Sequence, residues 1–92
     1  MWRSRKRIDD QVLEYLVRDR LNSKSPLEIV HDPVYEGGED VQKVAKSCIR
    51  LYRAGMLRRK EHFDPTRSRF RIVPDKFETI IRRIQKSPTP EQ

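Results

Sequence analysis

Residues 41–55 read VQKVAKSCIRLYRAG and decide the fold. Apolar side chains recur there at the three- and four-residue spacing of a helix, at Val41, Val44, Ala45, Cys48, Leu51 and Tyr52. Opposite them lie Lys43, Lys46, Arg50 and Arg53, and no Asp or Glu occurs from residue 41 to residue 60. The pattern predicts a helix with one buried stripe and one open cationic stripe. We expect it to span residues 39–54, because Glu39 and Asp40 favour a helix start and Gly55 favours a left-handed C-terminal cap.

Two further helices are predicted before this stretch. Residues 9–21 have an apolar helical pattern, with Asp9 as the expected N-terminal cap. Ser25-Pro26-Leu27-Glu28 has the spacing of a capping box with proline at the first helical position. This second helix should be short, because Asp32 precedes Pro33 and is pushed away from helical backbone angles.

After Gly55 the pattern changes to a hairpin and a last helix. Residues 56–63 and 69–73 alternate as strands do, and Asp64-Pro65-Thr66-Arg67 has the residue order of a type I turn. The last helix should follow Pro74, with Asp75 and Glu78 at capping-box spacing and an apolar face of Phe77, Ile80, Ile81 and Ile84. The predicted class is α+β, mainly helical.

Length and composition limit the architecture to one domain. The chain has 92 residues, 35% of them hydrophobic and 38% charged, with a mean hydropathy of −0.91. No stretch approaches the roughly 18 consecutive apolar residues that a membrane span needs, so we expect a cytoplasmic protein. A single cysteine, Cys48, allows neither an internal disulfide nor a cysteine-rich zinc site. Packing alone should therefore stabilise the fold.

The net charge of +7 is unevenly distributed along the chain. Residues 8–40 contain three Lys and Arg against nine Asp and Glu, whereas residues 41–73 contain ten against two. An acidic half followed by a basic half predicts an oriented surface for a polyanion, although chance clustering on solvated faces is the alternative. Four basic residues among the first seven form a further candidate arm.

The order helix, capped helix, two-faced helix, hairpin resembles a winged helix-turn-helix domain. In particular, residues 51–59, LYRAGMLRR, resemble the junction of recognition helix and wing in small prokaryotic transcriptional regulators. The resemblance covers residues 8–73, between an arm at 1–7, a helix at 74–86 and a tail at 87–92 that we expect to be disordered. It implies a third helix in the major groove and a wing on DNA backbone or minor groove. The chain departs from the family at residues 31–39, because this connection between the second and third helices is longer than a tight turn of about three to four residues. We expect Val34 and Tyr35 to pack this loop against the core.

Double-stranded DNA is therefore the predicted partner, because a helix fits its major groove but not the deep, narrow one of A-form RNA. We expect base contacts from Gln42, Lys43, Lys46 and Ser47, and phosphate contacts from Arg50 and Arg53. Wing contacts are expected from Arg58, Arg59, Arg67 and Arg69, although edge strands also carry basic residues that only block aggregation. The alternatives are a protein-interaction winged helix and a nonspecific architectural DNA-binding protein.

Other chemistry is not indicated by the sequence. His31 and His62 lack the spacing of a metal site or a catalytic triad, so we predict no catalytic residue, metal, cofactor or small-molecule effector. The apolar face of the last helix, Phe77, Ile80, Ile81 and Ile84, must be covered either by the first helix or by a second copy of the chain. We favour a homodimer on a palindromic site.

Overall fold

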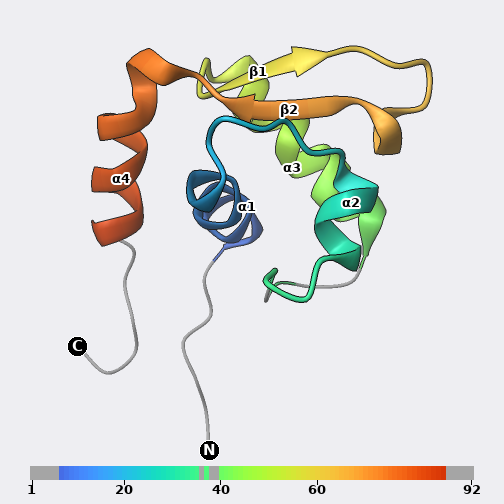
Figure 1. Ribbon diagram of the computed structural model, residues 1–92, viewed down its shortest axis with the longest axis horizontal. Helices are drawn as coiled ribbons and strands as arrows, with labels where there is room; N and C mark the ends of the chain where they lie inside the picture. The colour runs from blue at the N-terminus through green and yellow to red at the C-terminus, as the bar shows by residue number, and fades with distance from the viewer. Residues whose placement is uncertain (1–6, 36, 38–39, 87–92) are drawn as a thin grey trace, which may run out of the picture.

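Figure 1 shows the computed structural model of the chain, which describes residues 7–35, 37 and 40–86. The described part is α+β and mainly helical, with four α-helices and one two-stranded antiparallel sheet. The elements in chain order are α1 (Ile8–Arg18), α2 (Pro26–His31), α3 (Val41–Arg53), β1 (Leu57–Lys60), the 3-10 turn η1 (Pro65–Arg67), β2 (Arg69–Ile72), the 3-10 turn η2 (Pro74–Lys76) and α4 (Phe77–Lys86). Most of the basic arm, Glu39 and the tail lie outside the described residues.

The β-hairpin lies across α1 and α3, with α2 on one side and α4 beside α1 on the other (Figure 1). Apolar side chains from every layer meet beneath the hairpin. The fully buried ones include Leu13 and Leu16 of α1, Leu51 of α3 and Phe70 of β2. This shared core fixes α3 between α1, α2 and β1, which sets the face that α3 presents to solvent.

No helix in the described ranges is both long enough and apolar enough to cross a bilayer.

The ends of α2 and α3 follow the sequence signals. Ser25 Oγ accepts from the Glu28 amide at 3.2 Å, and Glu28 Oε1 accepts from the Ser25 amide at 2.9 Å, so the predicted capping box is confirmed. At the start of α3, the Asp40 carboxylate accepts from the Gln42 and Lys43 amides. The predicted left-handed cap is also confirmed, because Gly55 has a φ of +83°.

Two other capping predictions are wrong. α1 begins at Ile8 with Arg7 at its cap, so Asp9 lies inside the first turn and turns its carboxylate towards α3 instead. At the other end of the fold, Asp75 lies in η2 and α4 starts only at Phe77. Proline at position 74 starts the short 3-10 turn, which replaces the predicted capping box.

The sheet is shorter than predicted but has an additional partner. β1 pairs with β2 from Leu57↔Ile72 to Lys60↔Arg69, so β1 ends three residues before Phe63. Lys24 forms an antiparallel bridge with Phe70, with both backbone hydrogen bonds at 2.8 Å. The segment between α1 and α2 therefore lies along the free edge of β2, an interaction that no sequence pattern indicated.

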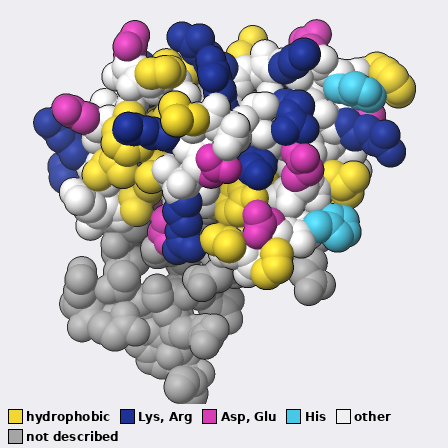
Figure 2. All heavy atoms as spheres, viewed as in Figure 1, with side chains coloured by type: hydrophobic (Ala, Val, Ile, Leu, Met, Phe, Trp, Pro, Cys, Tyr) yellow, Lys and Arg dark blue, Asp and Glu magenta, His cyan; other side chains and the backbone are white. Residues whose placement is uncertain are grey.

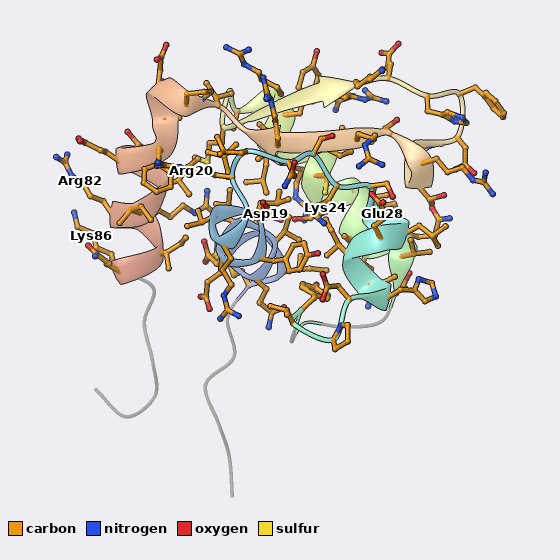
Figure 3. The ribbon with its side chains drawn as sticks, viewed as in Figure 1. Asp19, Arg20, Lys24, Glu28, Arg82 and Lys86 are labelled. Atoms are coloured by element: carbon orange, nitrogen blue, oxygen red, sulfur yellow. The ribbon has the colours of Figure 1, made fainter. Side chains whose placement is uncertain are left out.

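The apolar face of α4 packs onto its own chain. Ile80 is 0% exposed and belongs to the core, while Phe77, Ile81 and Ile84 are half-buried. The Arg20 guanidinium lies 4.2 Å from the centre of the Phe77 ring. Figure 3 shows Arg82 and Lys86 on the side of α4 turned away from α1. Ile80 is therefore excluded as a dimer contact, because packing of α4 against α1 already buries it.

Candidate nucleic-acid interface

The solvent face of α3 has the expected composition. Val44, Ala45, Cys48 and Leu51 are buried, whereas Gln42, Lys43, Lys46, Arg50 and Arg53 are exposed. The two-faced character of the helix is therefore confirmed. Tyr52 is the exception on the apolar stripe, because it is 42% exposed. Within the described part of the chain, Lys43, Lys46 and Arg53 form no ion pair or side-chain hydrogen bond, so their charges are available to an external anion.

Ser47 is a correction to the predicted base contacts. It is 0% exposed and donates a hydrogen bond to Asp9 Oδ1 at 2.5 Å, so it faces α1 rather than solvent. The same carboxylate receives Arg50 Nη2 at 2.6 Å and Arg50 Nε at 3.3 Å. We call Asp9, Ser47 and Arg50 the α1–α3 brace. It fixes α3 against α1 and also neutralises one of the four cations on the α3 face.

Electrostatics keep the α1–α3 brace ionised. Burial alone would raise the pKa of Asp9, but the hydrogen bonds from Arg50 and Ser47 outweigh it and hold that pKa below its ordinary value. The hydrogen bond to Asp9 also raises the pKa of Arg50. Arg50 remains half exposed, with 54% of its side chain accessible. It can therefore contact a phosphate only by sharing or leaving the Asp9 carboxylate.

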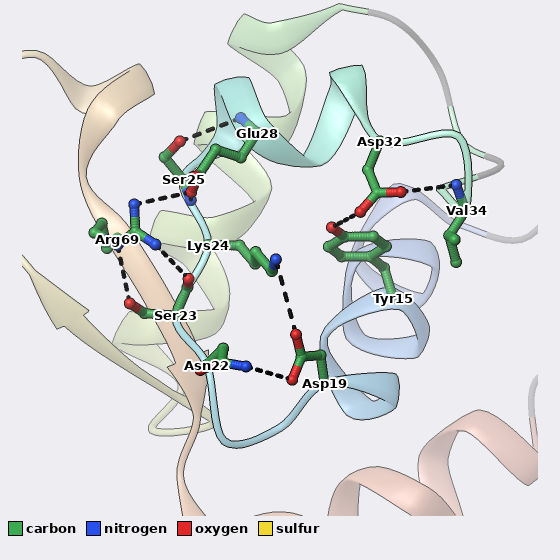
Figure 4. A network of polar contacts seen from close by, with 10 residues as sticks. All are labelled: Tyr15, Asp19, Asn22, Ser23, Lys24, Ser25, Glu28, Asp32, Val34 and Arg69. Atoms are coloured by element: carbon green, nitrogen blue, oxygen red, sulfur yellow. Dashed lines mark hydrogen bonds and ion pairs between the residues drawn. The ribbon is translucent and has the colours of Figure 1, made fainter.

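Arg69 of β2 is bonded to the segment before α2 and to the start of α2. Its Nε and Nη2 donate to Ser23 Oγ and Ser23 O at 3.0 and 2.7 Å, and its Nη1 lies 2.9 Å from Glu28 Oε1. Figure 4 shows this network joining β2 to the segment before α2. The backbone hydrogen bond within the capping box and then the Arg69 charge hold the pKa of Glu28 below its usual range. Arg69 thus clamps β2 to residues 23–28, and its expected phosphate contact stays a prediction, because 42% of its side chain is exposed.

Arg59 is also withdrawn from solvent. Only 18% of its side chain is exposed, and its guanidinium lies 5.7 Å from the Tyr52 ring centre and 5.9 Å from that of Phe70. Its Nε is buried and has no hydrogen-bond partner among the described residues, while Nη1 lies 3.8 Å from Glu61. Because Arg59 lies on the inward face of β1, its predicted role as an external DNA contact is not supported by its position.

The hairpin tip is more ordered than a simple turn. The predicted turn forms as η1, with the Arg67 amide donating to Asp64 O at 2.9 Å. Asp64 Oδ1 accepts from the Thr66 amide and hydroxyl, and these bonds hold the pKa of Asp64 below its usual value. Arg67 stays largely exposed, with Nε 3.7 Å from Asp64 Oδ2. The tip therefore presents Arg67 on a fixed backbone.

Phe63 at this tip was not among the site residues predicted from the sequence. It is 94% exposed and stacks on His62 with ring centres 4.4 Å apart. Buried Ser68 holds the loop by accepting from the His62 amide and donating to its carbonyl. The early end of β1 turns Phe63 away from the core, and the only sequence signal for it was the proximity of Asp64-Pro65.

The long connection before α3 is held from its first residues. Tyr15 donates to Asp32 Oδ2 at 2.5 Å, and Asp32 Oδ1 accepts from the Val34 amide (Figure 4). Half-buried Tyr35 meets the Tyr15 ring edge-to-face at 5.9 Å, so Tyr35 plugs the loop as expected. Val34 does not, because it is about half exposed. These contacts fix the start of the connection on α1.

Figure 2 shows the face of the molecule over α1 and α2, where Asp and Glu side chains are mixed with Lys and Arg. This mixing differs from the α3 face, whose exposed charged side chains are all basic. Within residues 7–35, 37 and 40–86, no three His, Cys, Asp or Glu side chains gather as metal ligands. Cys48 is buried, and burial raises the pKa of its thiol to about 12.

Comparison of the chain with protein-family models, curated proteins and solved structures found no match.

Proposed function

We propose that the protein binds double-stranded DNA through α3, as a winged helix-turn-helix domain of the kind found in transcriptional regulators. The observation that carries this proposal is the exposed face of α3, where Lys43, Lys46 and Arg53 have no counter-charge among the described residues. An α-helix about 10–12 Å across matches a major groove about 12 Å wide. The order of elements and the Lys24–Phe70 bridge beside the hairpin support the winged-helix assignment.

Roles on α3 follow from position along the helix. Gln42, Lys43 and Lys46 lie in the first two turns of α3, which would reach the base edges. Gln42 suits adenine, and the two lysines suit guanine. Arg53 in the last turn is assigned to phosphate, and Arg50 joins it when it leaves Asp9. Arg67 at the hairpin tip would contact backbone or minor groove. The protein acts by occupying its site, without chemistry of its own.

A salt titration with matched variants tests this proposal. Affinity for a duplex should fall with salt by about 0.9 log units per log unit for each neutralised phosphate. Arg53→Gln/Arg67→Gln removes one assigned phosphate contact from α3 and one from the hairpin tip, and should make that slope shallower by about 1.8. Arg82→Gln/Lys86→Gln removes the same charge from the outer side of α4 and should leave the slope nearly unchanged. Equal effects of both pairs, or binding that ignores salt, would refute docking through α3.

A separate experiment tests whether the protein prefers particular DNA sequences. After selection of bound duplexes from a random pool, Gln42→Ala and Lys46→Ala should relax the preference at particular positions. Arg67→Ala should weaken all sequences alike. If all three variants lose affinity uniformly and unrelated DNA competes fully, the protein is a nonspecific architectural binder. If no duplex binds tightly, the α3 face serves an acidic protein partner.

A homodimer is a separate proposal. Phe77, Ile81 and Ile84 are half-buried rather than covered, so dimerisation through their exposed edges would still fit a palindromic site. Sedimentation of the protein at rising concentration, alone and with DNA, tests it. A monomer under all conditions would remove the dimer and leave the monomeric binding mode.

A further inference from the structure

A second cationic site lies on the outer face of the sheet. A hollow of about 360 Å³ is lined by the segment Leu21, Asn22 and Ser23 and by Arg58, Arg59, Lys60, Arg69 and Arg71. This volume is at the lower end of the range of small-ligand sites, about 300–1,000 Å³. No acidic residue lines it, and the Lys24–Phe70 bridge holds its wall formed by residues 21–23 beside β2.

The strand register concentrates positive charge in this hollow. Phe70 and Ile72 face the core, so Arg69 and Arg71 occupy the outer face of β2. Their partners across the ladder, Lys60 and Arg58, are exposed on the outer face of β1. All four outward positions of the hairpin are therefore basic, in two directly opposed pairs. Like charges in such pairs destabilise a sheet, so this arrangement costs the fold stability unless an anion lies between them.

Only one of these four charges is neutralised within the described residues. Arg69 is paired with Glu28 and bonded to Ser23, which forms one rigid side of the hollow (Figure 4). Inward-facing Arg59 has Glu61 3.8 Å away. Arg58, Lys60 and Arg71 form no ion pair or side-chain hydrogen bond in the part of the chain that the structure describes. Three uncompensated cations thus converge on one hollow.

We propose that this hollow binds phosphate with two negative charges in total, either as one phosphate monoester or as two adjacent phosphates of a nucleic-acid backbone. Arginine forks match phosphate oxygens bidentately, and Arg58 and Arg71 face each other directly across the ladder. Bound phosphate would convert the repulsion between them into a shared contact. Leu21, 79% exposed at the wall, offers an apolar surface to the sugar or other organic part of the ester. The nucleic-acid form of this proposal rests on the proposed function, whereas the free-ester form does not.

The probe is inorganic pyrophosphate, added at constant ionic strength while backbone amide shifts of the full chain are followed. Shifts should concentrate at residues 21–23, 58, 60 and 71. Arg58→Gln/Arg71→Gln should weaken pyrophosphate binding at least about tenfold, because two charge-assisted contacts are lost. Arg82→Gln/Lys86→Gln, with the same net charge but on the outer side of α4, should change it less than about twofold. The double arginine variant should melt no lower than the wild type, because opposed like charges are removed.

A second titration with short duplex DNA identifies the source of the phosphate. If the duplex shifts the same amides and loses affinity in Arg58→Gln/Arg71→Gln, the backbone occupies the hollow. If only pyrophosphate shifts these amides and loses affinity in this variant, the ligand is a free phosphate ester. That conclusion does not depend on DNA binding by α3. The site is refuted if pyrophosphate shifts spread over all basic surfaces and both double variants lose binding equally.

Discussion

Replacing Asp9 by Asn should weaken the fold and at the same time strengthen the DNA binding proposed for α3. The carboxylate accepts hydrogen bonds from Ser47 and Arg50, and the amide keeps one oxygen for them but loses the charge. Hydrogen bonds to charged groups contribute about 1 kcal/mol more than neutral ones. Because Arg50 is half exposed, solvent screening keeps the loss near this value. We expect the free energy of unfolding to fall by about 1 kcal/mol at pH 7.

The same change releases Arg50 to the α3 face. With Asp9 neutral, one more cation is free to contact phosphate, so the salt slope of DNA binding should steepen by about 0.9. Duplex affinity at low salt should rise accordingly. Asp10→Asn is the matched control, because it makes the same charge change one residue away and removes the ion pair with Arg83 of α4 instead. It should leave the slope close to that of the wild type.

Acid pH provides an independent check on the α1–α3 brace. The pKa of Asp9 in the folded protein lies below its ordinary value of 3.8, so its stabilisation is present above that pH. It is lost as the pH falls through the lowered pKa. The stability difference between the wild type and Asp9→Asn, measured by urea unfolding, should therefore vanish in strong acid. A difference that persists there, or an Asp9→Asn slope equal to that of Asp10→Asn, would refute this account of Arg50.

Three other substitutions or reactions test the fold. Gly55→Ala should lower the free energy of unfolding, measured in urea, by about 1–2 kcal/mol, because φ is +83° and an alanine is strained there. No atom lies within 4 Å of the added Cβ, so a steric clash would not contribute. A loss under about 0.5 kcal/mol would contradict a backbone origin. Cys48 should react with iodoacetamide at pH 8 only as fast as the chain unfolds, since it is buried with a pKa near 12; rapid labelling of native protein would show that the thiol is accessible. Phe63→Ala should change stability by less than about 0.5 kcal/mol, because the ring is 94% exposed, and a larger loss would mean that the ring packs on the fold.

Local signals predicted the parts of the fold that local physics determines. The apolar stripe of α3, the Ser25–Glu28 capping box and the glycine after α3 all depend on residues within one or two turns. Their spacing is visible in the sequence, and the structure confirms each one, with Tyr52 as the exposed exception on the stripe. The exposed cations of α3 followed from the same periodicity, since the face opposite a buried stripe is open.

Contacts between distant residues could not be predicted in this way. Ser47 lies beside the apolar stripe, and its polarity suggested solvent until Asp9 of α1 was found to meet it. Arg69 looked like a wing cation, because its partner Glu28 lies 41 residues earlier in the chain. The bridge from Lys24 to Phe70 involves a single residue pair and leaves no periodic trace. In each case the partner is determined by tertiary packing alone.

The strand contact between Lys24 and Phe70 has a consequence for biosynthesis. Residues at the start of the chain complete their edge pairing only when β2 is available, and the Asp10–Arg83 ion pair forms later still. A nascent chain that has released α1 to α3 from the ribosome still has an open core, because Phe70, Ile72 and Ile80 are missing. Folding of these elements should therefore complete only once α4 has left the ribosome, with the early helices exposed to chaperones in the interval.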